Sequence, residues 1–385
     1  MYINSMRTNP SIEQAAPAAT LVFMPQAAVK GRGTVWAIEH RFTSEHHHTV
    51  DDGWGSLEQA AREERAAPQT QIIEQQVRTI LSGNDSPDIP FDLSINPYRG
   101  CEHGCVYCFA RPTHSYLNLS PGLDFETKII AKINAAERLR AALSAPGYEA
   151  LPLNIGSATD AYQPAERRLR ITRSLIEVMA EFSHPFSVIT KSAGIERDID
   201  LLAPLAQQRL VSAYMSIPTL DAGLARIMEP RATAPERRLQ TIERLARAGI
   251  PVGVSVSPLI PSLNEPELER ILDRARNAGA VTAFSTVLRL PWEVNPLFQQ
   301  WLQTHFPERA ARVMARVRDL RGGRDNDSRF GQRMSGQGVW ARLLTQRFER
   351  ATQRFGLARE RIVLDLSKFR RPASAVQPCA QAALF

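Results

Sequence analysis

Three cysteines, Cys101, Cys105 and Cys108, lie within eight residues of one another at the spacing C-x3-C-x2-C. Thiolates bind zinc and iron–sulfur clusters, and four protein ligands usually complete a structural zinc site or a fully ligated cluster. The fourth cysteine, Cys379, follows 271 residues further along the chain. Three clustered thiolates therefore predict a metal site with one open coordination position, where a substrate or a cofactor can bind.

Two residues are candidates for a fourth ligand. His103 lies inside residues 100–108, which we call the cysteine loop. It is able to bind zinc, although the sequence shows no second set of zinc ligands. Cys379 belongs to the predicted flexible tail. Gly100 and Gly104 permit the sharp backbone turns that bring three thiolates inward. Zinc binding and a purely structural cluster stay as alternatives to a reactive metal centre.

The elements that must position this loop lie between residues 89 and 291, where apolar, β-branched runs alternate with longer segments that have one polar face. Strands are predicted at 92–96, 151–155, 186–190, 211–217, 252–256 and 283–288, and helices at 127–143, 165–182, 198–207, 235–248 and 266–278. This alternation predicts an α/β fold with a parallel sheet and right-handed crossovers. Six units predict an open, partial (β/α)6 barrel, with the chemistry at the carboxyl ends of the strands.

Further segments flank the barrel. They are a disordered tail at 1–30, an N-terminal extension at 31–88, a basic, mostly helical C-terminal region at 292–371 and a flexible tail at 372–385. Within the extension, 56–81 has helical composition. Near the end of the helical region, the apolar residues 362–366 predict a last strand.

Positive charge is concentrated after the barrel. The whole chain has 47 Lys and Arg against 40 Asp and Glu, whereas 305–371 has 17 against 7. Nearly all of these cations are arginines, whose planar guanidinium binds two phosphate oxygens at once. The region predicts contact with a nucleic-acid backbone, and a solvated helical face is the alternative. The arginines in question are Arg309, Arg312, Arg316, Arg318, Arg321, Arg324, Arg329 and Arg333.

Composition excludes several classes of protein. A chain of 385 residues that is 43% hydrophobic and 23% charged is not disordered throughout. It has no apolar run of about 18 residues that would predict a membrane span. Four cysteines, three of them clustered, argue against a disulfide framework and for a reducing compartment. We therefore expect a cytoplasmic protein without a membrane partner.

The cysteine segment resembles the radical S-adenosylmethionine (SAM) superfamily over about 89–291. The resemblance rests on C-x3-C-x2-C after the first strand of a partial barrel, with Tyr107 before the last cysteine. It implies that Cys101, Cys105 and Cys108 hold three irons of a [4Fe–4S] cluster and that SAM chelates the fourth. It also implies reductive cleavage of SAM to a 5′-deoxyadenosyl radical that abstracts hydrogen from a substrate. A reductase or a flavodoxin-type protein would donate the electron.

The same resemblance implies a set of SAM-binding residues, which are Tyr107, Gly156, Ser157, Thr159, Asp160, Lys191 and Ser216. Gly156 lets the backbone approach the ligand, while Thr159 and Asp160 offer acceptors for the SAM ammonium. Lys191 would pair with the SAM carboxylate, and Ser216 would reach the ribose or the carboxylate. The aromatic residue of the cysteine loop would pack near adenine. The alternatives are a helix N-cap after the second strand, a surface lysine and an ordinary core tyrosine.

Within the superfamily, the chain is similar to the spore photoproduct lyase-like group of bacterial proteins. The segments that carry this similarity are 96–112 (NPYRGCEHGCVYCFARP), 120–126 (SPGLDFE), 159–166 (TDAYQPAE) and 189–192 (ITKS). Spore photoproduct lyase repairs a thymine dimer in DNA and uses a cysteine after the second strand as hydrogen-atom donor. This chain has Ser157 there, and a hydroxyl O–H bond is too strong for that role. The resemblance therefore implies DNA repair or modification with a different hydrogen-atom donor.

The last residues form the pattern Q-x-x-L-F, with Gln381, Leu384 and Phe385. It resembles the peptide that binds the bacterial sliding clamp, in which the apolar pair fills a pocket. A tail strand that docks on its own fold is the alternative. Three functions stay open: a radical SAM enzyme on nucleic acid, one on a peptide or small molecule, and a non-enzymatic nucleic-acid- or clamp-binding module with a structural metal cluster.

Overall fold

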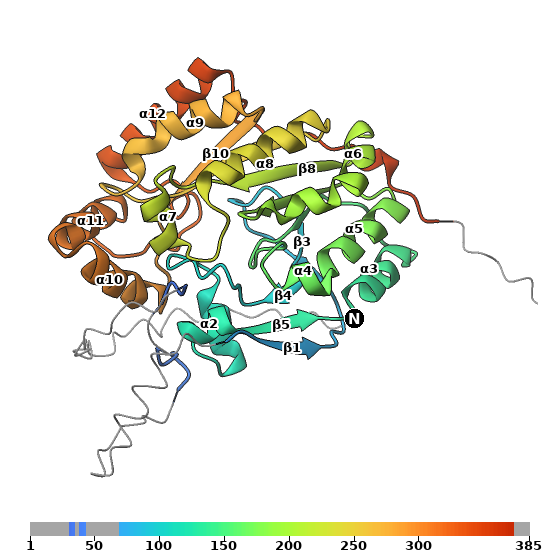
Figure 1. The fold of residues 1–385 in the computed structure, drawn as a ribbon, viewed down its shortest axis with the longest axis horizontal. Coiled ribbons are helices and arrows are strands. Elements are labelled where there is room, and N and C mark those ends of the chain that lie inside the picture. The colour runs from blue at the N-terminus through green and yellow to red at the C-terminus, as the bar shows by residue number, and fades with distance from the viewer. Residues whose placement is uncertain (1–30, 35–37, 44–68, 373–385) are drawn as a thin grey trace, which may run out of the picture.

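A sheet of parallel strands forms the centre of the computed structural model, which describes residues 31–34, 38–43 and 69–372. The strand order is β10-β9-β8-β7-β6-β3-β2 (Figure 1). The parallel strands are β3 (Leu93–Ile95), β6 (Leu153–Ile155), β7 (Phe186–Thr190), β8 (Val211–Ser216), β9 (Val252–Leu259) and β10 (Thr282–Val287). β2 (Leu81–Gly83) pairs antiparallel with β3 at one edge. Within the described ranges the two edge strands do not pair, so the predicted open, partial (β/α)6 barrel is confirmed.

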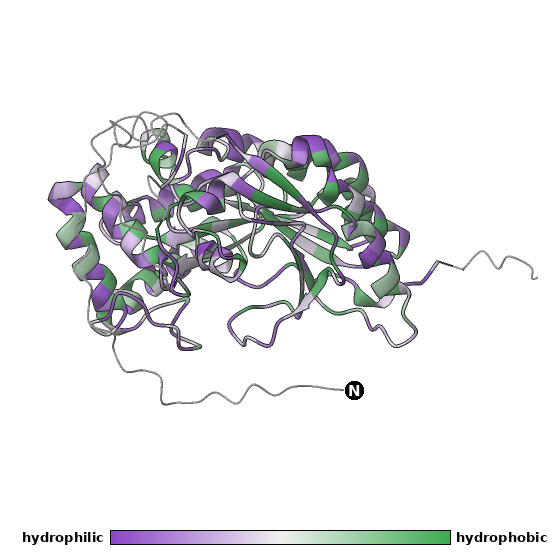
Figure 2. Cartoon of the chain, turned by 90° about the horizontal axis from the view of Figure 1, so that it is seen from below, coloured by the Kyte–Doolittle hydropathy of each residue, from purple (hydrophilic) through white to green (hydrophobic). Residues whose placement is uncertain are grey.

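The parallel strands are apolar because both faces of the sheet are covered. Ile155, Val188, Ala213 and Val254 are at most 1% exposed. Figure 2 shows the apolar residues gathered along the central strands and the polar residues on the outer faces of the helices. Burial on both faces fixes the strand register, since a slip of one residue would disrupt the packing of every side chain. The carboxyl ends of the strands therefore keep fixed positions at one edge.

Helices connect the strands. They are α3 (Ala135–Ser144), α4 (Glu166–Leu169), α5 (Ile171–Glu181), α6 (Ile199–Gln207), α7 (Ala222–Met228), α8 (Pro235–Arg247) and α9 (Leu268–Asn277). Pro235 is the first residue of α8, where its missing N–H costs no hydrogen bond. Gly249 and Gly279 follow α8 and α9 with φ of +76° and +106°, which only glycine adopts without strain. The helix boundaries predicted from these residues are confirmed.

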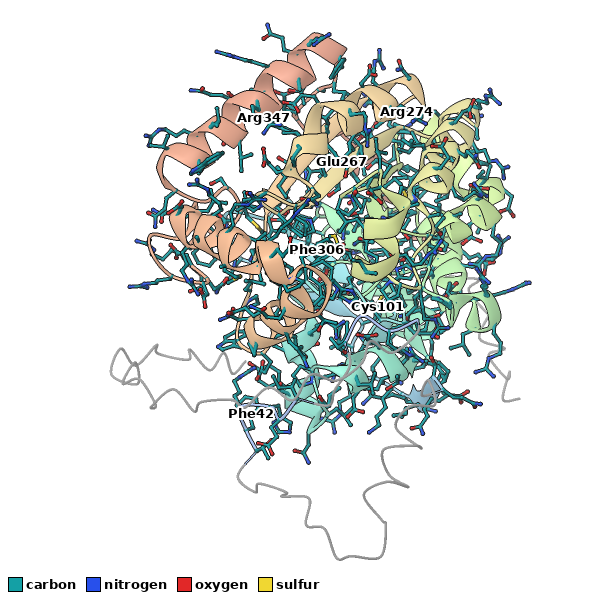
Figure 3. The ribbon with its side chains drawn as sticks, turned by 60° about the vertical axis from the view of Figure 1, so that its left-hand side comes forward. Phe42, Cys101, Glu267, Arg274, Phe306 and Arg347 are labelled. Carbon is teal, nitrogen blue, oxygen red and sulfur yellow. The ribbon has the colours of Figure 1, made fainter. Side chains whose placement is uncertain are left out.

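Three helices follow β10, namely α10 (Val294–His305), α11 (Pro307–Leu320) and α12 (Gly338–Phe355), so the helices predicted after the barrel are present. Their buried faces include Phe298 and Val313, which are 0% exposed. Arg347 of α12 binds Glu269 of α9, with Nη2 2.8 Å from Oε2, and this pair holds α12 against the barrel. Figure 3 shows Arg347 well apart from Cys101, so the pair belongs to packing rather than to the cysteine loop.

A second, three-stranded sheet corrects two predictions. Residues 128–132, expected inside a helix at 127–143, form β5 (Lys128–Lys132). This strand pairs in parallel with β1 (Gln71–Gln75) and antiparallel with β4 (Tyr98–Arg99). β1 also lies inside 56–81, and the described residues 69–81 contain no helix, so the helical interpretation is wrong there, while 56–68 falls outside the described residues. Pairing with partners distant in sequence outweighs the local helical composition.

Two further elements differ from the predictions. The helix expected at 165–182 is interrupted at Arg170, whose φ is +53°, between α4 and α5. The last strand expected at 362–366 is absent from the described residues, where a 3₁₀ helix (Leu366–Lys368) follows an irregular segment. The edge of β10 is met instead by Ala358, which forms a single parallel bridge with Thr282. The short helix α2 (Leu123–Thr127) and a 3₁₀ helix (Arg111–Leu117) were not predicted.

Candidate active site

The cysteine loop follows β3 and β4 at the carboxyl edge of the main sheet. Gly100 and Gly104 have φ of +80° and +66°, so both make the turns that the sequence predicts. A Cβ at Gly104 would lie 2.7 Å from a carboxylate oxygen of Glu126. Cys101 and Cys105 are 6% and 7% exposed and Cys108 is partly exposed; all three are free thiols.

Burial determines the chemistry of these thiols. Burial, followed by the charge of Asp160, raises the pKa of Cys101 well above its ordinary value, and burial raises the pKa of Cys105 to about 12. In the part of the chain that the structure describes, no three His, Cys, Asp or Glu side chains form a site for a single metal ion. Such buried thiols lose their protons when a positively charged metal centre binds to the sulfur atoms. Three free thiols on one short loop are the kind of donor set that holds an iron–sulfur cluster.

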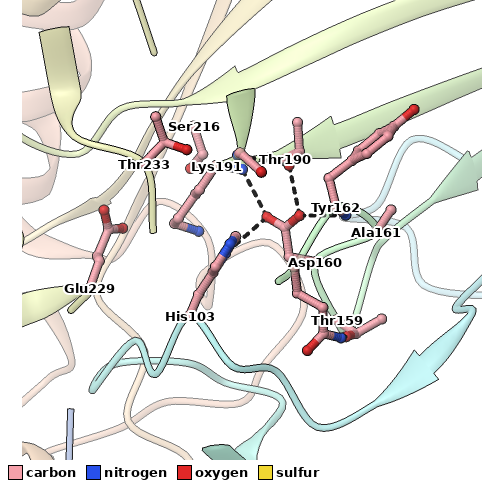
Figure 4. Close-up of polar contacts among 12 residues, drawn as sticks. His103, Thr159, Asp160, Ala161, Tyr162, Thr190, Lys191, Ser216, Glu229 and Thr233 are labelled. Atoms are coloured by element: carbon pink, nitrogen blue, oxygen red, sulfur yellow. Dashed lines mark hydrogen bonds and ion pairs between the residues drawn. The ribbon is translucent and has the colours of Figure 1, made fainter. Parts of the chain in front are cut away.

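Asp160 follows β6 and connects the end of β7 to the cysteine loop (Figure 4). Its Oδ1 accepts hydrogen bonds from Thr190 Oγ1 at 2.7 Å and from the Tyr162 amide at 2.9 Å. Its Oδ2 accepts from the Lys191 amide at 2.8 Å and lies 3.3 Å from Nδ1 of His103. Burial alone would raise the pKa of Asp160, but these partners lower it below its ordinary value. Asp160 is therefore a fixed carboxylate that orients the loop, and both of its oxygens already have partners.

The neighbours of Asp160 contact the start of the loop. Thr159 donates a hydrogen bond from Oγ1 to the carbonyl oxygen of Gly100 at 2.7 Å. Ser157 Oγ accepts one from Asn96 Nδ2 at 3.1 Å. Gly156 has a φ of +90°, and a Cβ there would lie 3.0 Å from a backbone oxygen of β7. The structure therefore brings these predicted residues together around the beginning of the cysteine loop.

Charged side chains gather beside Cys105. Figure 4 shows the Lys191 side chain reaching toward the loop from the end of β7, and its Nζ lies 5.8 Å from the centroid of the Tyr107 ring. The Tyr107 hydroxyl donates to Glu229, which also accepts from Arg238 Nη2 at 2.5 Å. Burial alone would lower the pKa of Lys191, but Cys105 and Glu229 raise it above its ordinary value. Lys191 therefore remains an ammonium, and within the described residues it forms no ion pair.

Glu229 and Arg238 were missed by sequence reasoning. Arg238 belongs to α8, whose many charged residues are typical of a solvent-exposed face. It is nevertheless 1% exposed, and its Nη1 donates to the carbonyl oxygen of Ser216 at 2.9 Å. Ser216 thus lies against the same buried ion pair as Tyr107. No local pattern marks these partners, because their burial comes from segments far apart in sequence.

The N-terminal extension reaches the cysteine loop through Gly33 and Thr34. The Glu126 carboxylate accepts hydrogen bonds from their amides at 2.9 Å and 3.0 Å and from Arg111 Nη2 at 2.6 Å. Glu126 and Arg111 are both 0% exposed. A Cβ added to Gly33 would lie 1.7 Å from the carbonyl oxygen of Gly104, so only glycine fits there. This buried network, which the sequence does not predict, holds the loop between its first two cysteines.

Comparison with known proteins identifies the class. The model of the radical SAM superfamily matches residues 95–275. An uncharacterised protein of Mycobacterium tuberculosis is 38% identical over 236 residues, which are 60% of this chain and 68% of the relative. An uncharacterised protein of Methanocaldococcus jannaschii is 24% identical over 214 residues, or 56% of this chain and 76% of that protein. The chain belongs to the radical SAM superfamily. It is accordingly a radical SAM enzyme, and its cofactors are a [4Fe–4S] cluster and SAM.

Solved structures of spore photoproduct lyase share this fold. A point mutant of that enzyme matches over 83% of this chain and 87% of its own, with a TM-score of 0.52 and 16% identity. The enzyme complexed with dinucleoside spore photoproduct matches over 74% and 81%, with a TM-score of 0.51 and 16% identity. These likenesses confirm the predicted fold. None of the described helices has the length and apolar character needed to span a membrane.

Proposed function

We propose that Cys101, Cys105 and Cys108 are the three protein ligands of the cluster and that the enzyme acts on nucleic acid. One observation carries the first part: three free thiols, two of them buried, lie on a loop at the carboxyl ends of the parallel strands. When bound, the cluster and SAM supply a radical that takes a hydrogen atom from the substrate. The chain binds and orients both partners and keeps water away.

The other predicted residues have different roles in this proposal. Lys191 contacts SAM directly, because its ammonium is held beside Cys105 without an ion-pair partner among the described residues. Gly156 leaves room at the end of β6, where a side chain would meet the backbone of β7. Thr159 and Asp160 are positioning residues, since their polar atoms hold Gly100 and His103 of the loop. Tyr107, Ser157 and Ser216 line the same edge of the sheet.

Lys191 offers a direct test of the SAM site. Replacement of Lys191 by Met removes the cation proposed to bind the SAM carboxylate, and one charge-assisted hydrogen bond contributes about 1.5–3 kcal/mol. We expect the affinity for SAM to fall about 10- to 150-fold, measured by anaerobic equilibrium dialysis with reconstituted protein. The control is Lys128→Met, which removes a lysine of β5 that pairs with Asp124. Equal SAM affinity in both variants, with normal iron content, would contradict the assignment.

The arginine-rich region supports the proposed nucleic-acid substrate, but fewer of its arginines are suited to bind phosphate than the sequence predicts. Four of its arginines, Arg316, Arg318, Arg329 and Arg333, form ion pairs with Asp side chains. Arg321 is 1% exposed and donates to backbone carbonyls. Within the described residues, Arg309, Arg312 and Arg324 are exposed and form no ion pair. These three are the arginines of that group that we assign to phosphate contacts.

The substrate class has its own experiment. The reconstituted enzyme is incubated under dithionite with SAM and with oligonucleotides deuterated in the bases or the sugars. We expect deuterium to appear in 5′-deoxyadenosine. Formation of 5′-deoxyadenosine without deuterium from any DNA or RNA, combined with transfer from a peptide or small molecule, would overturn the nucleic-acid part and leave the radical chemistry in place.

Two proposed partners, the bacterial sliding clamp and a protein electron donor, are supported by the sequence alone. Gln381, Leu384 and Phe385, the proposed sliding-clamp contacts, lie outside the described residues. A pull-down with the bacterial clamp, comparing the full chain with a chain that ends at Ala380, tests that contact. A reductase or flavodoxin-type electron donor is tested by replacing dithionite with such a protein in the SAM-cleavage assay.

A further inference from the structure

Arg289 and Phe109 meet at the carboxyl edge of the sheet. Arg289 is the second residue after the end of β10, and Phe109 directly follows Cys108. The guanidinium carbon of Arg289 lies 5.3 Å from the centroid of the Phe109 ring. This ring is 49% exposed. Core packing does not account for a large aromatic ring that lies beside a proposed cluster ligand and exposes half of its surface.

The charge of Arg289 is not balanced by an ion pair in the described part of the chain. Its Nη1 makes a weak contact with Met334 Sδ at 3.8 Å. Asp88, the acid whose charge acts on Arg289, already accepts from Arg333 Nε at 2.7 Å and from the Gly331 amide at 2.7 Å. Burial, and then the charge of Arg333, lowers the pKa of Arg289. A bound anion would therefore stabilise this guanidinium.

The backbone on either side of Arg289 is fixed. The carbonyl of Leu288 accepts a hydrogen bond from Arg321 Nη2, and the amide of Leu288 donates to Leu259 of β9 at 3.0 Å. The amide of Leu290 donates to Asn326 Oδ1 at 3.1 Å. Arg289 therefore extends from a preorganised segment, which reduces the entropy that a ligand must remove on binding.

We propose that Arg289 and Phe109 form a nucleotide subsite beside the cysteine loop. The guanidinium binds a phosphate of the substrate strand, and the exposed face of the Phe109 ring stacks on one base of that strand. This inference rests on the proposed action on nucleic acid and names the state of the substrate: a single strand, or a nucleotide turned out of a duplex.

The chemistry of the pair selects this ligand. Arginine recognises phosphate through paired N–H donors, and an aromatic side chain stacks on any base because every base has a π face. Bases inside a duplex are already stacked on one another, so a base must be unpaired to reach the ring. An acidic peptide would use the guanidinium but would leave the ring exposed.

Fluorescence anisotropy with the reconstituted full chain tests the subsite. The probes are a labelled single-stranded 12-mer DNA, the same 12-mer as RNA, its DNA duplex and a 12-mer of abasic sugar-phosphate units, each titrated at several salt concentrations. The wild type should bind the single strands more tightly than the duplex and more tightly than the abasic chain.

The variants separate the two contacts. Phe109→Ala should weaken binding of the single strands about 5- to 150-fold, since stacking of one base contributes about 1–3 kcal/mol, and should leave binding of the abasic chain unchanged. Phe109→Trp should restore binding. Arg289→Gln should weaken binding of both and reduce the slope of log K against log salt by about 0.7, the value for one phosphate contact. Arg140→Gln, which removes an exposed arginine paired with Glu181, is the control.

The outcomes distinguish failure of the proposed nucleic-acid function from failure of the proposed subsite. If the wild type binds no oligonucleotide, the proposed nucleic-acid function fails. If it binds in a salt-dependent way but all variants bind like the wild type, only the subsite is overturned. Equal loss of abasic and base-containing strands in Phe109→Ala would refute stacking, as would equally effective competition by an acidic peptide. If Phe109→Ala does not fold, Phe109→Leu, which keeps an apolar side chain but removes the aromatic ring, takes its place in the comparison, and Arg289→Gln tests the phosphate contact separately.

Discussion

Replacing Cys105 with Ala is expected to remove the iron–sulfur chromophore and to lower 5′-deoxyadenosine formation below about one hundredth of the wild-type rate, a loss of more than about 2.7 kcal/mol in transition-state stabilisation. Cys105 is 7% exposed, and the adjacent amide of Val106 is fixed by a hydrogen bond to the carbonyl of Met228. Because the backbone there is held in place, we expect the loop to keep its conformation when the thiolate is removed.

The matched control for this prediction is Cys379→Ala. The three-ligand account makes no use of Cys379, so this variant should keep its iron, its colour and its SAM cleavage. Iron and sulfide content, the visible spectrum and chromatography of the nucleoside product measure the outcome. A coloured and active Cys105→Ala protein would refute the ligand assignment, and a colourless Cys379→Ala protein would show that a fourth cysteine is required.

Glu126→Gln is expected to lower the free energy of unfolding by about 3–5 kcal/mol, because it leaves the buried Arg111 without its counter-charge. Both side chains are 0% exposed, and Arg111 Nη2 lies 2.6 Å from Glu126 Oε1. The carboxylate also binds the amides of Gly33 and Thr34. The substitution therefore weakens the attachment of the N-terminal extension to the cysteine loop as well.

Urea unfolding of the apo protein under reducing conditions measures this effect. The control is Glu181→Gln, which breaks an exposed pair with Arg140 whose side chains are 36% and 49% exposed. Such a pair contributes about 0–1 kcal/mol. Similar free energies of unfolding for the two variants would mean that the Glu126 network does not hold the loop in place.

Local sequence patterns were sufficient to predict the parallel sheet and the cysteine loop. The parallel strands are buried on both faces, so their sequences are rich in apolar and small residues, a signal that is visible without any partner; β8 and β9 are examples. The cysteine loop is equally local, because its three cysteines lie within eight residues and its turns depend on Gly100 and Gly104. These features depend on residues that are close together in the chain.

Features that depend on distant partners were not predicted. β5 is a strand because β1 and β4 pair with it, although its sequence continues smoothly into α3. Arg238 is buried among distant segments: it donates to the carbonyl oxygen of Ser216, and its partner Glu229 accepts from Tyr107. Asp160 is held by Thr190 Oγ1 and the Lys191 amide at the end of the next strand, and no local pattern reveals these contacts. In each case a long-range contact decides what a locally ambiguous residue does.

The most direct test of the account is electron paramagnetic resonance of the reconstituted, dithionite-reduced enzyme with and without SAM. Three thiolate ligands leave one iron without a protein ligand, so SAM should change the g-values of the reduced cluster, and Lys191→Met should require a higher SAM concentration for the same change. A spectrum that SAM leaves unaltered, in protein that contains about four irons per chain, would contradict the claim that the cysteine loop keeps an open coordination position.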